Sequence, residues 1–320
     1  MAAKIGYVAL LPNGTIPSPL PSTPVPIPTS TSVPTSPTTG LLAAWNQASG
    51  IYADGTNQTA RYNISNGVVI DTLSSIQWEQ AESANTMSWS SVSDYCASQT
   101  TGGFSDWRAP NIGELQTLVD FTVGYPNVPI NATAFPNTSY INFWSSTQVS
   151  GSSAYNWVVL LSRYGGTQSD SNTTLDLVRC VRSSYPVPFP TRYTLTSGVV
   201  TDTVTGLIWQ QHAPTIPYSQ PGANTYCNSL SLGDFTFGWR LPTIKELSSL
   251  VDFNVSPPGL MMDPAAFAGE PLSWYWSSTP QAGFSGMTWF VDFSGDAELS
   301  VVIGYTNNRY SVRCVHDPAT

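Results

Sequence analysis

Residues 238–253 read Gly-Trp-Arg-Leu-Pro-Thr-Ile-Lys-Glu-Leu-Ser-Ser-Leu-Val-Asp-Phe, and residues 106–121 repeat the pattern, beginning Asp-Trp-Arg-Ala-Pro-Asn. In the later copy, Thr243 and Glu246 have the spacing of a capping box, in which each side chain bonds the other residue's backbone amide. Asn111 holds the N-cap position of the earlier copy. Both copies therefore predict the start of a helix.

Apolar residues follow each predicted N-cap at the spacing of one helical face. Glu114 completes the capping box of the earlier copy. The apolar positions are Ile244, Leu247, Leu250 and Val251 in the later copy and Ile112, Leu115, Leu118 and Val119 in the earlier one. Each helix is expected to bury this face.

The repetition extends over most of the chain, which indicates two domains of one kind. The matched segments are Arg61-Tyr62 with Arg192-Tyr193, 67–71 with 198–202, Tyr95-Cys96 with Tyr226-Cys227, 144–147 with 276–279, and 178–181 with 312–315. We predict an N-terminal strand at 1–11, a linker at 12–40, a first repeat domain at 41–185, a Pro-rich joint at 186–190 and a second repeat domain at 191–320.

The composition is typical of a secreted or cell-surface protein. Charged residues make up only 10% of the 320 residues, and the formal net charge is −9. An acidic chain repels phosphate backbones, so nucleic acid is not an expected partner. No apolar run approaches the roughly 20 residues of a membrane helix, so no membrane insertion is expected. No signal peptide is expected either, because Lys4 precedes only a brief apolar run.

The N-terminal segment combines an apolar strand with an extended arm. The strand presents Ile5, Tyr7, Val8, Leu10 and Leu11 on both faces, a pattern that favours burial on both sides. The linker at 12–40 is rich in Pro, Ser and Thr, which favours extended polyproline II. The strand is therefore expected to reach another molecule, although it could instead fold back onto a sheet of its own first domain.

Three ordered motifs carry a resemblance to a known family. They are Trp-Arg-Leu-Pro-Thr-x-x-Glu-Leu, Tyr-Trp-Ser-Ser-Thr and Val-Arg-Cys-Val, and the resemblance covers roughly residues 61–183 and 192–316. The chain resembles a bacterial family long labelled a domain of unknown function, typified by the C-terminal domain of the Legionella collagen-like adhesin. The first copy departs from the motif at Ala109-Pro110-Asn111.

This resemblance implies an α+β fold class with two tandem C-type-lectin-like domains, related to formylglycine-generating enzymes. An N-terminal β-strand and an extended Pro/Thr-rich arm precede them. It also implies a place on a bacterial surface or in an appendage. The chain is similar at family level to tandem-domain subunits of glycan-coated extracellular fibrils.

The four cysteines form two repeated pairs. The economical pairing is Cys96 with Cys180 and Cys227 with Cys314, each within its own domain. The alternative is four buried thiols. Disulfides would leave no cysteine for the chemistry of formylglycine-generating enzymes.

No catalytic constellation emerges from the other polar residues, and we expect neither an enzyme nor a cofactor. His212 and His316 have no histidine counterpart in the first copy, so a zinc site is not expected. Capping explains Glu114 and Glu246 better than a general-acid role does. The remaining repeated charges are assigned to turns or internal ion pairs: Asp71 with Asp202, Arg108 with Arg240, and Arg179 with Arg313.

Tryptophans and glycosylation motifs supply the candidate binding and modification sites. Eight of the 11 tryptophans pair across the copies and are assigned to the core, whereas Trp45, Trp89 and Trp274 have no counterpart. These three could stack on sugar rings, fill a subunit contact or simply pack locally. Candidate glycosylation sites are Asn13, Asn57, Asn63, Asn131, Asn137, Asn172 and Asn254, with Thr23, Thr29, Thr31, Thr35 and Thr38 in the linker.

The leading hypothesis for function is a structural subunit of an extracellular fibre. Its N-terminal strand would insert into the next identical subunit by β-augmentation, and such a head-to-tail contact grows into a fibre. The alternative is a secreted or surface adhesin that binds glycans through its tandem domains. An enzyme is a third possibility for which the sequence offers no site.

Overall fold

The computed structural model describes residues 61–72, 74–182, 192–256, 259–295 and 299–317, all within the compact unit Pro34–Thr320. We call 61–182 the first repeat and 192–317 the second repeat. The N-terminal strand, the linker, the joint at 186–190 and Trp45 lie outside the described residues. So do the candidate glycosylation sites Asn13, Asn57 and those in the linker.

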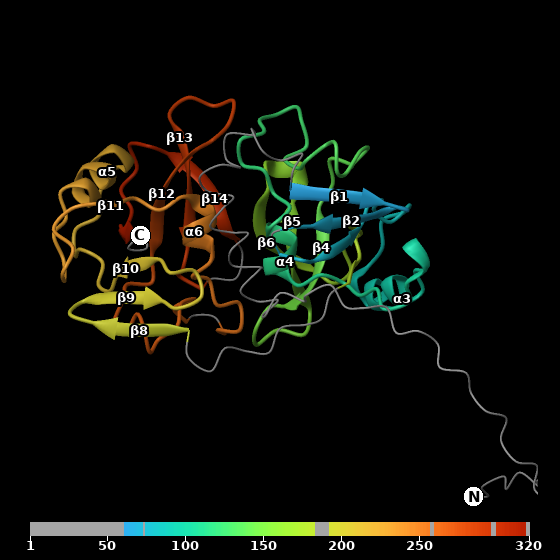
Figure 1. The fold of residues 1–320 in the computed structure, drawn as a ribbon, viewed down its shortest axis with the longest axis horizontal. Coiled ribbons are helices and arrows are strands. Elements are labelled where there is room, and N and C mark those ends of the chain that lie inside the picture. Colours follow the sequence, from blue (N-terminus) through green and yellow to red (C-terminus); the bar gives the residue numbers. More distant parts are fainter. Residues whose placement is uncertain (1–60, 73, 183–191, 257–258, 296–298, 318–320) are drawn as a thin grey trace, which may run out of the picture. The chain divides into compact units, whose positions relative to one another are not determined.

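Each repeat is mostly β-sheet with few helices (Figure 1). The first repeat contains β1 (Tyr62–Ser65), β2 (Val68–Asp71), β3 (Gln77–Glu79), η1 (Trp89–Ser91), α3 (Val92–Ala97), η2 (Thr101–Gly103), α4 (Ile112–Gln116), β4 (Phe143–Gln148), β5 (Tyr155–Leu160), η3 (Leu161–Arg163), β6 (Gly166–Ser171) and β7 (Val181–Arg182). The second contains β8 (Tyr193–Thr196), β9 (Val199–Asp202), β10 (Ile208–Gln210), α5 (Gln220–Asn228), β11 (Trp239–Arg240), α6 (Ile244–Ser248), β12 (Trp274–Pro280), β13 (Met287–Asp292), β14 (Leu299–Tyr305) and β15 (Val315–His316).

A small sheet in each repeat begins with a tight hairpin. The strand orders are β1-β2-β3-β7 and β11-β15-β10-β9-β8. The hairpins turn at Asn66-Gly67 and Ser197-Gly198, where all four φ values are positive. Two successive positive φ values define the turn whose twist matches paired strands. The short Asn-Gly and Ser-Gly sequences therefore set both hairpins.

One larger sheet runs through both repeats, in the order β12-β13-β14-β6-β5-β4. β14 and β6 pair antiparallel, with Val301 opposite Thr167, and the Val301 amide donates to Thr167 Oγ1 at 3.1 Å. The strands approach so closely that a Cβ at Gly166 would lie 2.6 Å from the Val301 carbonyl oxygen. The two predicted domains thus share a continuous sheet.

Aromatic contacts join the repeats in a reciprocal way. Phe121 of the first repeat packs edge-on against Trp289 of the second, at 4.8 Å between ring centroids. Phe253 and Trp157, which occupy the equivalent positions with the repeats exchanged, pack at 5.0 Å. This is the pattern of a two-fold, self-complementary interface, built here within one chain. All eight tryptophans that pair across the copies are buried, as predicted.

The predicted helix starts are confirmed, but the helices are shorter than expected. Both capping boxes form, at Asn111 and at Thr243. α4 nevertheless ends after five residues, and Leu118 and Val119 follow in a turn of i→i+3 hydrogen bonds. The Thr117 hydroxyl donates to a carbonyl of the last helical turn, which helps to end the helix. The predicted apolar face is still buried, partly from this turn.

Candidate functional site

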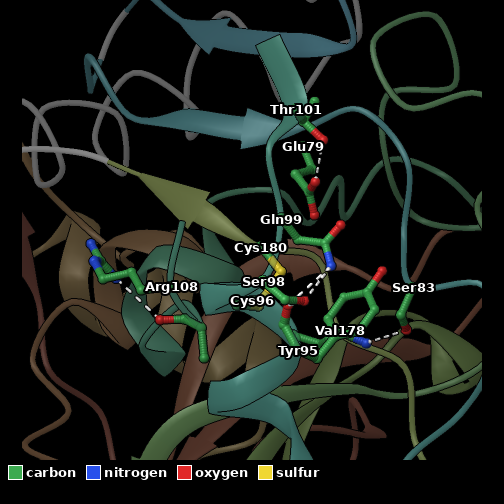
Figure 2. Close-up of a disulfide and its surroundings, with 11 residues drawn as sticks. Glu79, Ser83, Tyr95, Cys96, Ser98, Gln99, Thr101, Arg108, Val178 and Cys180 are labelled. Atoms are coloured by element: carbon green, nitrogen blue, oxygen red, sulfur yellow. Dashed lines mark hydrogen bonds between the residues drawn. A yellow bond between two sulfur atoms is a disulfide. The ribbon is translucent and has the colours of Figure 1, made fainter. Parts of the chain in front are cut away.

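Two disulfides join a helix of each repeat to the residue just before its final strand, and both pairings are as predicted. Cys96 in α3 bonds Cys180, and Cys227 in α5 bonds Cys314, with Cα atoms 5.6 and 5.4 Å apart. Figure 2 shows the first disulfide beside Tyr95, whose carbonyl oxygen accepts from neighbouring side chains. Both bridges are completely buried. A crosslink closing a loop of this length stabilises a fold by about 4–5 kcal/mol in the chain-entropy model.

The repeated motifs meet at one structural junction near the start of α4. Thr147 in β4 places its hydroxyl oxygen 2.9 Å from the Ile112 amide, adding a second cap to the helix. Arg108 holds both oxygens of Glu114 at 2.6 and 2.8 Å, and one of these also accepts from the Asn111 amide. The second repeat builds the same junction from its equivalent residues. These contacts support a structural role for both glutamates.

The arginine of each Val-Arg-Cys-Val strand is buried in the core. Arg313 donates to the carboxylate of Glu270 at 2.7 Å and to the carbonyl oxygens of Gln210 and Gln211. Burial lowers the pKa of its counterpart Arg179 to about 10, against the opposing charges of nearby glutamates. These arginines therefore donate hydrogen bonds to buried oxygens. The repeated aspartates Asp71 and Asp202 are likewise bonded by Arg61 and Arg192.

The two histidines make different contacts. His212 bonds the Glu270 carboxylate at 3.1 Å, whereas His316 bonds the Asp317 carbonyl. Within the described ranges, no three His, Cys, Asp or Glu side chains gather so that they could hold a metal ion.

The two hairpins each present an open edge, which is the kind of site that strand insertion requires. β1 and β8 are the outer strands of their sheets among the described residues. In β1, the residues flanking Ile64 pair with β2 through hydrogen bonds, so the N–H and C=O of Ile64 point away from the hairpin. Leu195 has the same position in β8. Both side chains are exposed, at 43% and 47%.

The outer strands of the six-stranded sheet are built differently. β4 is bulged, and backbone groups of other segments already meet its free side: the Trp144 amide donates to Leu177 and the Ser146 amide to Pro110. β12 repeats both features through Trp276 and its neighbours. These edges are therefore covered, whereas the hairpin edges at β1 and β8 have the geometry of strand acceptors.

The two described candidates for sugar stacking differ in exposure. Trp89 is half-buried, and its indole N–H donates to the Ser145 carbonyl at 3.1 Å. Trp274 is 42% exposed, at the first position of β12, and Phe290 and Tyr310 support its ring. Its indole N–H donates to Asp292 at 2.6 Å. Of these two, only Trp274 offers a ring face of useful size.

The candidate glycosylation sites fall into three settings. Asn63, Asn137 and Asn254 are exposed, and Asn137 lies in a turn with a φ of 59°. Asn172 is half-buried and donates to the Ser153 carbonyl. Asn131 is buried, and its side-chain oxygen accepts from two backbone amides, which argues against modification of the folded chain.

A cavity of about 250 Å³ in the first repeat was not anticipated from the sequence. Glu79 and Asn137 are among the residues that line it, and Thr101 donates to the Glu79 carboxylate at 2.5 Å (Figure 2). Burial raises the pKa of Glu79 above its ordinary value. The counterpart of Glu79 in the second repeat is Gln210. This difference between the copies is the sequence signal that could have indicated the cavity.

Fold and junction together define a protein of two tandem, disulfide-closed, mostly β domains with a shared structural core. The chain belongs to the Lcl C-terminal domain family, whose sequence profile matches residues 67–182 and 198–316, more than half of the chain. No curated protein gives a significant match.

The tandem family domains fit a surface or adhesin-like protein. Two disulfides fit an extracellular location. Among the described residues, no helix is long and apolar enough to cross a membrane.

Proposed function

We propose that this protein is a structural subunit of an extracellular bacterial fibre that polymerises by insertion of its N-terminal strand into an identical neighbour. The observation that carries the proposal is the open hairpin edge at β1 and β8, which the two repeats build in the same way. An incoming strand would pair with the outward backbone groups of Ile64 or Leu195. Such head-to-tail pairing adds one subunit after another without closing a ring.

Backbone hydrogen bonding and apolar burial are the two contributions that favour this pairing. Each backbone hydrogen bond contributes about 0.5–1.5 kcal/mol net. Burial of the apolar strand residues and of the exposed Ile64 or Leu195 side chain adds about 25 cal/mol per Å². Ordering of the arm opposes association. The Pro-rich composition of 12–40 reduces that cost, because a polyproline II arm is already extended, at roughly 3.1 Å per residue.

The first test compares the full chain with a chain lacking residues 1–11. Negative-stain microscopy and size-exclusion chromatography should show fibres from the full chain and monomers from the truncated one. Identical monomers from both would refute the fibre proposal. Fibres from both would show that another surface drives assembly.

The acceptor edge can be tested with proline variants. Ile64→Pro and Leu195→Pro each remove an outward N–H without removing a hydrogen bond of the hairpin itself. The proline variant at the edge that accepts the strand should no longer form fibres. The matched Ile64→Thr or Leu195→Thr variant, which keeps the N–H, should still form them. Fibres from the double proline variant would exclude both edges as acceptors.

We also infer that the fibre is glycosylated at exposed sites. Asn63, Asn137 and Asn254 are the exposed described candidates, and the Thr-rich linker supplies more hydroxyl groups. Intact-mass measurement before and after deglycosylation tests this proposal. A native mass equal to that of the bare chain would refute it.

A second candidate function is adhesion to neutral glycans at Trp274. Its exposed ring is held by Phe290 and Tyr310, as a stacking platform requires. Glycan-array binding that disappears in Trp274→Ala but persists in Trp89→Ala would favour this function. The absence of glycan binding by the parent chain would exclude it.

A further inference from the structure

The first repeat contains a buried polar cluster that its own side chains do not satisfy. Asn156 in β5 lies directly opposite Asp170 in β6, so both side chains project from the same face of the sheet. Asn156 is 0% exposed, and neither its Oδ1 nor its Nδ2 has a hydrogen-bond partner among the described residues. A buried amide with no partner costs free energy, so a water molecule or an ion that bonds Asn156 would stabilise this position.

Asp176 brings a second carboxylate to the same place. It is 3% exposed, its backbone bridges to Met87, and its Oδ2 has no partner in the described part of the chain. Burial, followed by the neighbouring Asp170 carboxylate, raises the pKa of Asp176 to about 7. Asp170 Oδ1 is occupied by the Ser171 amide and the Thr174 hydroxyl. Asp176 also shares a side-chain hydrogen bond with Asp170, so the two carboxyl groups are in direct contact, and no cationic side chain of the described residues contributes to the shift.

The second repeat shows how the same position is filled without a ligand. Thr288, Gly304 and Tyr310 occupy the places of Asn156, Asp170 and Asp176, and Thr288 pairs with Gly304 as Asn156 pairs with Asp170. The backbone bridge to Met87 is matched by one from Tyr310 to Tyr218.

The Tyr310 ring packs against three aromatic rings of the second repeat, and a Cβ at Gly304 would lie 3.1 Å from its hydroxyl oxygen. In the second repeat, the Tyr310 ring thus fills the space at this position. In the first repeat, the same position holds the unpaired oxygens of Asn156 and Asp176.

We propose that the first repeat binds one calcium ion through the carboxylates of Asp170 and Asp176 and the amide oxygen of Asn156. A divalent cation neutralises both carboxylates and gives the unpaired Asp176 and Asn156 oxygens a partner. Calcium suits this set, because it accepts mixed carboxylate and amide oxygens in irregular geometry. Asp170 is half-exposed, so water can complete the coordination shell from its side. The proposal is independent of strand insertion and of fibre formation.

Isothermal titration of the EDTA-treated full chain with Ca²⁺ tests this site. We expect one ion per chain, with a dissociation constant of about 0.1–1 mM, the range of extracellular modules. Asp176→Asn should weaken binding at least tenfold. Asp94→Asn removes an exposed charge of the same repeat, outside the cluster, and should bind Ca²⁺ as the parent does.

Thermal unfolding provides the second readout and separates loss of binding from loss of the fold. The parent's Tm should rise on addition of Ca²⁺. Without Ca²⁺, Asp176→Asn should melt at or above the parent's Tm, because it relieves the repulsion between carboxylates, and Ca²⁺ should no longer shift it. Absence of binding up to about 10 mM Ca²⁺ would mean that water alone fills the site and would overturn the proposal. Unchanged affinity in Asp176→Asn would overturn it equally.

Discussion

The sharpest test of how the two repeats are joined concerns Lys245. This lysine lies in α6 of the second repeat, and its ammonium donates to the carbonyl oxygen of Thr117 in the first repeat at 3.4 Å. Burial and, to a smaller extent, the charge of Arg61 lower its pKa to about 7, against the opposing charges of Asp120 and Asp71. A charged group is thus buried between the repeats with one long hydrogen bond. We expect Lys245→Met to stabilise the protein at low pH.

The magnitude follows from proton linkage. A pKa of about 7 in the folded chain and 10.5 in the unfolded chain corresponds to about 5 kcal/mol, at about 1.4 kcal/mol for each pKa unit. Below pH 7, Lys245 is protonated in both states, and the full destabilisation is present. As the pH rises from 7 to 10.5, the unfolded chain holds the additional proton, so the free energy of unfolding increases with pH.

Urea denaturation followed by tryptophan fluorescence at pH 6 and pH 10 measures this effect. At pH 6, Lys245→Met should raise the free energy of unfolding by several kcal/mol, less about 1 kcal/mol for the lost hydrogen bond. Near pH 10 the gain should largely vanish. Arg163→Met, which removes an exposed charge, controls for net charge and should behave as the parent at both pH values.

Two outcomes would refute this reasoning. The first is destabilisation by Lys245→Met at pH 6, which would show that the ammonium makes a net favourable contact. The second is an equal effect at pH 6 and pH 10, which would show that the lysine titrates normally and that only its packing matters.

Three further predictions concern the covalent and packing framework. Replacing Cys96 and Cys180 by alanine should lower the free energy of unfolding by about 2–5 kcal/mol in urea denaturation, and an unchanged midpoint would contradict the role given to the disulfide. Glu246→Ala breaks the capping box and removes the paired arginine contact, so we expect a loss of about 1–3 kcal/mol by the same assay, whereas a neutral effect would show that the junction is redundant. Gly166→Ala places a methyl group against the Val301 carbonyl oxygen and should lower Tm through a loss of about 1–3 kcal/mol, while an unchanged Tm would mean that β6 and β14 separate without cost.

Local features of this fold could be predicted because their physical causes are local. A capping box needs two residues three positions apart, and a tight hairpin needs two residues that accept positive φ. The helices that begin at 112 and 244 are shorter than their apolar spacing suggests, because that spacing continues into a buried turn as readily as into another helical turn. Repetition supplied the nonlocal information, since matched cysteines and tryptophans in two copies indicated pairing and burial.

The polar cluster could have been found in the same way, but only by comparing differences between the copies. Asn156, Asp170 and Asp176 are each unremarkable surface-type residues in the sequence. Their counterparts in the second copy are Thr288, Gly304 and Tyr310, so each of these three polar side chains is replaced by a smaller or an aromatic residue. Strand register places Asn156 opposite Asp170, and only the folded chain brings Asp176 to Asp170.

By itself, the sequence determined the two repeats, their helix starts, their disulfides, their aromatic core and their family. The tertiary structure alone decided that the repeats share one sheet and one reciprocal aromatic contact. The reason is that β6 reads Gly-Thr-Gln-Ser-Asp-Ser, a polar strand whose pairing with β14 depends on backbone hydrogen bonds. Backbone pairing between distant segments leaves little trace in side-chain pattern. For the same reason, the outer positions of β1 and β8 among the described strands, where the proposed fibre contact lies, follow only from the strand order.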